Sequence, residues 1–113
     1  MMTINLATLT VTQHAREHRW NRLVQCVQAV VGLGEVVYVC PSTKAKYEED
    51  LIVNCVTSTG LVFVVNATRN ILITGYLGSV RYVQGLYQGR IPNELFITIR
   101  RNERKYSYLY SIF

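Results

Sequence analysis

The apolar positions between residues 13 and 31 follow the period of an amphipathic helix. Apolar side chains recur there at the three- and four-residue steps that place residues on one helical face. They are Trp20, Leu23, Val24, Val27, Val30 and Val31. Thr12 is suited to cap the start of this helix, and Gly32 and Gly34 are suited to end it. The pattern therefore predicts a helix over about residues 13–31.

Strand-like patterns follow the helix. EVVYVC (35–40) predicts a strand that Pro41 ends, and the polar segment 42–50 predicts a loop. Three further β-rich runs cover residues 51–56, 61–66 and 71–77, joined by the short turn-forming segments TSTG and ATRN. This spacing predicts an antiparallel meander of about four strands with one face against the helix. Residues 3–11 predict a short edge strand or a mobile arm.

The pattern becomes less regular after residue 78. Residues 78–90 combine three glycines with aromatic and basic side chains, which favours an irregular or partly extended segment. Residues 92–113 favour a helix from Asn93, because Leu95, Ile99 and either Asn102 or Tyr106 share a helical face, although LFITI is also typical of a strand. We predict a single α+β domain over residues 1–113, with an N-terminal helix or helix pair packed on the meander. Its core covers about residues 12–80, and a C-terminal helix or strand extends it.

Charge adds information about the partner. The 113 residues carry a net charge of +5, and half of them are apolar, which suffices for one modest core. Residues 1–60 contain five basic and five acidic side chains, whereas residues 61–113 contain seven basic and two acidic ones. The whole excess of positive charge therefore lies in the second half of the chain, and this predicts a negatively charged partner.

Cysteine usage and hydropathy bear on the compartment. Cys26, Cys40 and Cys55 are an odd number without a close pair, which fits small buried groups in a reducing cytoplasm better than a disulfide framework. The first charged residue is Arg16, and no basic segment precedes an apolar core as in a signal peptide. The apolar runs are too short and too interrupted to cross a bilayer. We expect a cytoplasmic protein that does not span a membrane.

The stretch TQHAREHRWNR (12–22) contains the two histidines of the chain. His14, His18 and Arg22 lie four residues apart each time, so a helix would bring them onto one face. That face lies nearly opposite the apolar one, so a solvated polar surface is one interpretation. A zinc site is another, but HExxH and CxxC patterns are absent from the sequence, and we expect no metal and no cofactor.

The order of these parts resembles a known family. An opening HAxxRxxxR helix, a glycine–acid pair before a strand, and hairpins that end in an "hhITxY" strand are similar to a family of small bacterial and phage domains. Its members are grouped by fold with ribonucleases of the barnase, EndoU, colicin and RelE type. The matching residues are His14-Ala15, Arg22, Gly34-Glu35, LVFVV and ILITGYL, over about residues 12–80. The chain departs from the family where His18 replaces the first arginine of the motif, and the Gly-Ile break after Arg22 is missing.

The resemblance implies a RelE/barnase-like fold and metal-independent RNA cleavage. In that chemistry the ribose 2′-hydroxyl attacks the adjacent phosphate, which requires a base, an acid and a cation. His14 and His18 would exchange the protons, since histidine titrates near neutral pH, and Arg22 or Arg81 would hold the phosphate. Thr74 and Tyr76, at the matching end of the last core strand, would position the phosphate or donate from their hydroxyls. A residue of either type is also common in strands simply because it fits a sheet.

The basic second half predicts a nucleic-acid surface. Its cations alternate with tyrosines, and guanidinium groups with aromatic rings are what single-stranded RNA or DNA needs for phosphate contact and base stacking. The predicted contact residues are Arg69, Arg81, Tyr82, Arg90, Arg100, Arg101, Arg104 and Lys105. Tyrosine and arginine also dominate protein interfaces, so an acidic inhibitor or a host protein is an alternative partner.

Two hypotheses follow from the sequence. The first is a toxin-like endoribonuclease that acts on single-stranded RNA. The second is a non-catalytic binding module of the kind that phages encode, anti-defence or regulatory, that engages a host protein or nucleic acid. The replacement of a family arginine by His18 is compatible with both, because it either adds a general acid or marks a site that has lost its chemistry.

Overall fold

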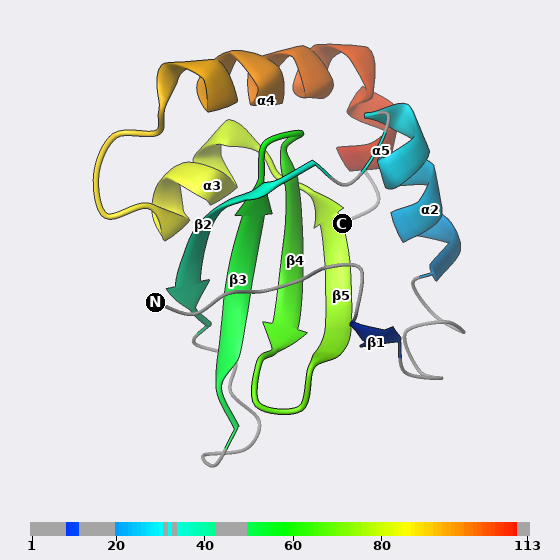
Figure 1. Ribbon diagram of the computed structural model, residues 1–113. Coiled ribbons are helices and arrows are strands. Elements are labelled where there is room, and N and C mark those ends of the chain that lie inside the picture. The colour runs from blue at the N-terminus through cyan, green and yellow to red at the C-terminus, as the bar shows by residue number, and fades with distance from the viewer. Residues whose placement is uncertain (1–8, 12–19, 31, 33, 43–49, 111–113) are drawn as a thin grey trace.

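The computed structural model describes residues 9–11, 20–30, 32, 34–42 and 50–110 (Figure 1). Its centre is a five-stranded sheet with the strand order β1-β5-β4-β3-β2. The strands β2 (Val36–Pro41), β3 (Ile52–Thr57), β4 (Leu61–Asn66) and β5 (Ile71–Leu77) form an antiparallel meander, and β1 (Thr10–Val11) pairs in parallel with β5. The predicted meander and the α+β class are confirmed. Of the two alternatives for residues 3–11, Thr10–Val11 form an edge strand, and residues 3–8 lie outside the described residues.

The helix α2 (Trp20–Ala29) covers one face of the sheet, which we call the first face. Leu23 and Cys26 of α2 are buried with Phe63 and Cys55 from the strands. The helix ends at Ala29, two residues before the predicted end, and the following Gly32 and Gly34 adopt φ angles of 118° and 70°, which glycine tolerates best. The predicted cap Thr12 and the first turns of the predicted helix lie outside the described residues.

A second helix, α3 (Val80–Leu86), packs on the opposite face, which we call the second face. Our prediction of an irregular segment over residues 78–90 was wrong here. The Ser79 side chain accepts a hydrogen bond from the backbone N–H of Tyr82 and so caps the helix. Val83 is completely buried against Val56 and Val62 of the sheet. The cap and this burial outweigh the low helix propensity of Gly85.

The predicted C-terminal helix is present as α4 (Asn93–Lys105), which lies over one end of the sheet (Figure 1). Leu95, Ile99 and Asn102 are buried on the helical face that the sequence indicated. The Asn102 side chain donates to the carbonyl of Thr59 in the β3–β4 turn at 2.9 Å, which fixes α4 on that turn. We expected the core within residues 12–80, but these side chains extend the buried core well past residue 80.

The short helix α5 (Ser107–Tyr110) ties the C-terminal part of the chain to the rest of the fold. The Tyr106 hydroxyl donates to the carbonyl of Ala29 at the end of α2 at 2.6 Å. The Tyr110 hydroxyl donates to the carbonyl of Gly78 after β5 at 3.1 Å. Leu109 is buried in the core of the first face. The segment after α4 therefore joins α2 to the end of the sheet.

A bulge in β5 decides which side chains face each side of the sheet. Val64 pairs with Thr74 and Val65 pairs with Leu72, so Ile73 is an extra residue on β5. After the bulge, in the direction of the chain, Thr74 and Tyr76 point to the second face, while Gly75 lies on the first face beside Phe63. Leu72 returns to the core of the first face. The bulge thus keeps Leu72 and Gly75 on the same face although they lie three residues apart.

Within the described ranges, none of the helices combines the length and the apolar composition needed to cross a bilayer.

Candidate functional site

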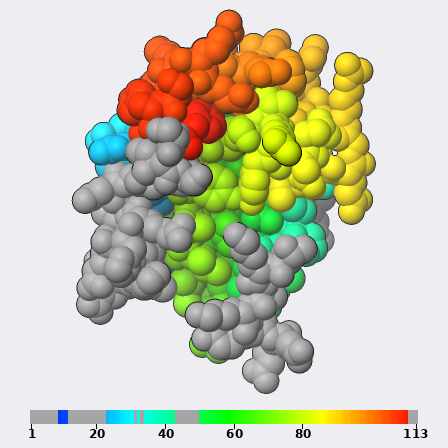
Figure 2. Space-filling view, turned by 180° about the vertical axis from the view of Figure 1, so that it is seen from behind, coloured from blue at the N-terminus to red at the C-terminus, as the bar shows by residue number. Residues whose placement is uncertain are grey.

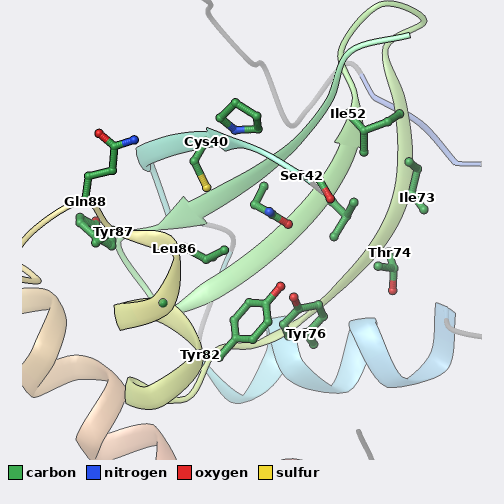
Figure 3. Close-up of a pocket in the computed structure, with 14 residues that line it drawn as sticks. Cys40, Ser42, Ile52, Ile73, Thr74, Tyr76, Tyr82, Leu86, Tyr87 and Gln88 are labelled. Carbon is green, nitrogen blue, oxygen red and sulfur yellow. The ribbon is translucent and has the colours of Figure 1, made fainter. Parts of the chain in front are cut away.

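A hollow of about 830 Å³ opens on the second face of the sheet, between the strands and the end of α3 (Figure 3). This volume is within the range of roughly 300–1,000 Å³ that is usual for small-molecule sites. The lining comes from β2, β3, β4, β5, α3 and the residues that follow α3. The lining residues are Cys40, Pro41, Ser42, Ile52, Asn54, Val64, Ile73, Thr74, Tyr76, Tyr82, Gly85, Leu86, Tyr87 and Gln88.

The floor of the hollow is one row of side chains across four strands. The pairing register places Cys40 beside Asn54, Asn54 beside Val64, and Val64 beside Thr74. Their side chains share the second face because paired residues point to the same side of a sheet. Asn54 is only 5% exposed, and its side chain hydrogen-bonds the Cys40 thiol. The floor therefore carries the polar side chains of Asn54 and Thr74 on either side of the apolar Val64.

Two tyrosines form the wall next to α3. The rings of Tyr76 on β5 and Tyr82 on α3 meet edge to face, with centroids 5.4 Å apart, and their hydroxyls share a hydrogen bond. Figure 3 shows these hydroxyls and the Cys40 thiol directed toward the space between β2 and α3. Burial, and secondly the hydrogen bond with Tyr82, raise the pKa of Tyr76. Tyr76 is therefore a neutral hydroxyl at physiological pH and is unsuited to act as a base there.

A second pair of tyrosines lies near β2, and Tyr87 of this pair lines the hollow. The rings of Tyr38 and Tyr87 are stacked, with their centroids 4.0 Å apart and their planes at 16°. The Tyr87 hydroxyl is buried and finds no hydrogen-bond partner among the described residues. A buried hydroxyl without a partner costs about 1–3 kcal/mol of stability.

The unpaired hydroxyl leads to a prediction about stability. Replacing Tyr87 by phenylalanine keeps the ring stack and removes the buried hydroxyl, so we expect the free energy of unfolding to rise by about 1 kcal/mol. Urea denaturation measures this change. Tyr106→Phe is the matched control, since it removes a hydroxyl that donates to Ala29, and we expect it to lose about 1 kcal/mol. A loss of stability in Tyr87→Phe would show that its hydroxyl has a favourable contact.

The hollow has no formal charge among its described lining residues. Cys40 is half-buried, so our expectation of three fully buried cysteines holds for Cys26 and Cys55 but not for Cys40, which lines the hollow. Burial raises the pKa of the Cys40 thiol, and its hydrogen bond with Asn54 offsets this only in part. A thiol of this kind is mostly protonated and weakly nucleophilic. The arrangement is suited to bind a neutral polar ligand rather than to transfer protons.

The outer side of α4 is a separate, positively charged surface, which we call the α4 surface. It consists of Arg100, Arg101, Arg104 and Lys105 together with Phe96 and Ile97, all exposed. The Arg100 guanidinium lies over the Phe96 ring at 5.5 Å. In Figure 2 the residues of α4 form the top of the molecule, and the α3–α4 connection continues along its side.

Glu103 does not neutralise the α4 surface fully, because it faces inward. Its Oε1 atom accepts from the backbone N–H of Val80 at 2.8 Å, and the side chain is mostly buried. Its Oε2 atom lies 3.8 Å from Arg100, a loose ion pair. Within the described residues, Arg101, Arg104 and Lys105 form no ion pair with a carboxylate.

The structure brings some of the predicted site residues together. Thr74, Tyr76 and Tyr82 all line the hollow, and Arg81 is an exposed neighbour of Tyr82 on α3. Arg22 is carried by α2 against the first face, so the sheet lies between its helix and the side chains of Thr74 and Tyr76. The side chain of Arg22 is not among those described. His14 and His18 lie outside the described residues.

The predicted cations are spread over the molecule. Arg69 lies in the β4–β5 turn, at the end of the sheet opposite α4 (Figure 1), and pairs with Asp50 at 3.0 Å. Arg90 is exposed between α3 and α4, whereas Arg100, Arg101, Arg104 and Lys105 share α4. In the part of the chain that the structure describes, no three His, Cys, Asp or Glu side chains come close enough to hold a metal ion.

Sequence reasoning missed much of the hollow. Asn54 gave the clearest available signal, because it is a polar residue in the middle of the otherwise apolar strand LIVNCV. A buried polar residue in a strand usually contacts another polar group or a ligand. Ser42 and Gln88 gave no signal, since polar residues are ordinary in the loops after β2 and α3.

Comparison with protein-family models, curated proteins and solved structures gave no match to this chain. The likeness to the HAxxRxxxR family thus stays a prediction from the sequence, and the functional conclusions below depend on the geometry described above.

Proposed function

We propose that this protein binds single-stranded RNA through the α4 surface. The observation that carries the proposal is the grouping of Arg100, Arg101, Arg104 and Lys105 on one exposed side of α4. The helix has two carboxylates, Glu103, which faces inward, and Glu94 in its first turn. Phosphate oxygens of a strand would meet the guanidinium and ammonium groups, and this contact supplies most of the affinity of such proteins.

Aromatic side chains on and beside α4 favour a single strand over a duplex. Phe96 is exposed on the helix, and Tyr108 on α5 is 61% exposed. Unpaired bases stack on aromatic rings, whereas the bases of a duplex are stacked on one another and not available. Cations with exposed rings thus fit a strand whose bases are turned outward.

Binding is better supported than cleavage by the described residues. Cleavage requires groups that exchange protons near neutral pH, and the two histidines of the chain are His14 and His18, outside the described residues. Tyr76 and Cys40 in the hollow are both shifted toward their neutral forms. A ribonuclease activity therefore depends on whether His14 and His18 take part.

Alanine at Arg101 tests the α4 surface. We expect Arg101→Ala to weaken binding of a fluorescein-labelled 12-nucleotide RNA about fivefold, the equivalent of roughly 1 kcal/mol. The slope of log Kd against log salt should fall by about 0.7, because one phosphate contact to a single strand is lost. Fluorescence anisotropy over a series of salt concentrations measures both quantities.

Arg69→Ala is the matched control, since it removes the same charge from an exposed arginine at the opposite end of the sheet. We expect its affinity to stay within about twofold of the wild type, because only long-range screened attraction changes. Equal weakening by both variants, or no binding by the wild type, would contradict the proposal.

The same samples separate binding from cleavage. The RNA is incubated with the protein in EDTA and run on a denaturing gel, alongside His14→Ala and His18→Ala. Intact RNA supports the binding function. Fragments that end in a 2′,3′-cyclic phosphate and that disappear in a histidine variant would instead support the ribonuclease hypothesis.

A further inference from the structure

We propose that the hollow on the second face binds a nucleobase, that is, an uncharged planar ring with hydrogen-bonding groups on its edge. This site is distinct from the α4 surface, because none of the four α4 cations belongs to its lining. The inference goes beyond the proposed RNA binding, since a free nucleoside could occupy the hollow without any phosphate contact.

The row of side chains on the floor of the hollow matches a nucleobase in the positions of its polar and apolar groups. Asn54 and Thr74 are polar, and Val64 lies between them on the middle strand. Two strand spacings, about 10 Å, separate the polar residues. A nucleobase is apolar on its face and polar on its edge, so a ring that lies on Val64 would present its edge to the amide on one side and the hydroxyl on the other. Asparagine is a common partner for base edges.

The wall supplies an aromatic surface of the kind that bases use. Tyr82 is 42% exposed and stands at the rim, with its ring held edge to face against Tyr76. Leu86 of α3 adds an apolar group on the same side. Stacking of a base on an aromatic side chain contributes about 1–3 kcal/mol, and it requires no charge on either partner.

The absence of charge narrows the ligand class. Among the described lining residues, none carries a carboxylate, an ammonium or a guanidinium group. A phosphate or carboxylate would lose its hydration there without gaining an opposite charge, which is unfavourable. A hydrocarbon would form no hydrogen bond with the Asn54 amide or the Thr74 hydroxyl, so it would use none of the polar groups on the floor. A neutral ring with a polar edge avoids the desolvation cost and can use these groups.

The nucleobase that binds in the hollow can belong to a free nucleoside or to an RNA strand. Arg81 precedes Tyr82 on α3, and Arg90 follows Gln88 after the hollow; both arginines are exposed. They could contact the phosphates of a strand whose base enters the hollow, but a free nucleoside would not need them.

Titration with adenosine, guanosine, cytidine and uridine tests the site, followed by two-dimensional NMR of the labelled protein. We expect at least one nucleoside to bind with saturable shifts at residues of β3, β5 and α3. Tyr82→Ala and Thr74→Val should each weaken that binding at least fivefold, while Val37→Ala, at an exposed residue outside the lining, should leave it unchanged. Ribose 5-phosphate should cause no shifts in the hollow.

Thermal denaturation of each variant shows whether it remains folded under these conditions. No saturable binding by any nucleoside, or binding that persists unchanged in folded Tyr82→Ala and Thr74→Val, overturns the proposal. Strong shifts in the hollow with ribose 5-phosphate would overturn it too, because they would assign the hollow to an anion.

A second arm distinguishes the two sources. A 12-nucleotide RNA is compared with an abasic strand of the same length, with wild type and Tyr82→Ala. If a base of a strand enters the hollow, Tyr82→Ala weakens binding to RNA and not to the abasic strand. If RNA affinity is unchanged while nucleoside binding is lost, the ligand is a free nucleoside. Nucleosides carry no phosphate, so failure of the α4 surface to bind RNA leaves this test intact.

Discussion

Replacing Gly60 by alanine is expected to lower the free energy of unfolding by about 3 kcal/mol, because two costs add at this position. Gly60 has a φ angle of 89°, where an L side chain is strained. A Cβ atom would also lie 2.7 Å from the Asn102 amide nitrogen, which is buried and donates to Thr59. The amide cannot move without losing that hydrogen bond, so α4 itself must shift. Urea denaturation measures the loss.

Gly85→Ala is the control for the Gly60 experiment. Gly85 lies inside α3, and a Cβ atom there would meet nothing within 4 Å. Alanine should therefore raise stability by about 0.5–1 kcal/mol, since it favours the helix more than glycine does. If Gly60→Ala stays within 1 kcal/mol of the wild type, then the β3–β4 turn does not hold α4 in the manner described above.

Phe63→Ala is expected to cost about 4 kcal/mol, in the range found for buried aromatic side chains that are cut to alanine. Phe63 is 2% exposed in the middle of β4 and packs on the first face. Its ring lies directly over Gly75, where a Cβ atom would come within 2.7 Å of Phe63 Cδ1 and 2.9 Å of Leu23 Cδ1. Removal of the ring leaves a cavity between the sheet and α2, which rigid strands cannot fill.

Phe63→Leu and Val37→Ala serve as comparisons in the same denaturation series. Leucine fills much of the space, so we expect a loss of about 1–1.5 kcal/mol. Val37 is half-exposed on the edge strand β2, and its truncation should change stability by less than about 0.5 kcal/mol. A Phe63→Ala loss no larger than that of Phe63→Leu would mean that α2 closes onto the sheet.

Local sequence patterns predicted the elements that depend on backbone preference and on the periodic burial of side chains. The helix end at Gly32 and Gly34, the three hairpin strands and the face of Leu95 and Ile99 all follow from backbone preference or from periodic burial. The helix α3 was missed for the opposite reason. Val83 stabilises it through contacts with Val56 and Val62, which are more than twenty residues distant along the chain, and local propensity does not record such contacts.

The sequence identified individual residues of the candidate sites, but it did not show which of them lie together. Thr74, Tyr76 and Tyr82 were each identified, yet their meeting in one hollow depends on the position of α3, which the sequence did not predict. The seven cations of the second half looked like one surface along the chain. The hairpin direction carries Arg69 to the opposite end of the sheet from α4, where it pairs with Asp50.

The extra residue Ile73 also bears on how the molecule tolerates deletion. Ile73 has no partner on β4, so its deletion would leave Leu72 opposite Val65 and Thr74 opposite Val64, with the regular alternation of sides restored. Leu72 would stay in the apolar interior, and Thr74 and Tyr76 would keep facing the open side of the sheet. A chain shortened at Ile73 should therefore keep both its interior and its ligand-facing hydroxyls, whereas deletion of a paired residue such as Gly75 would turn one part of the strand over.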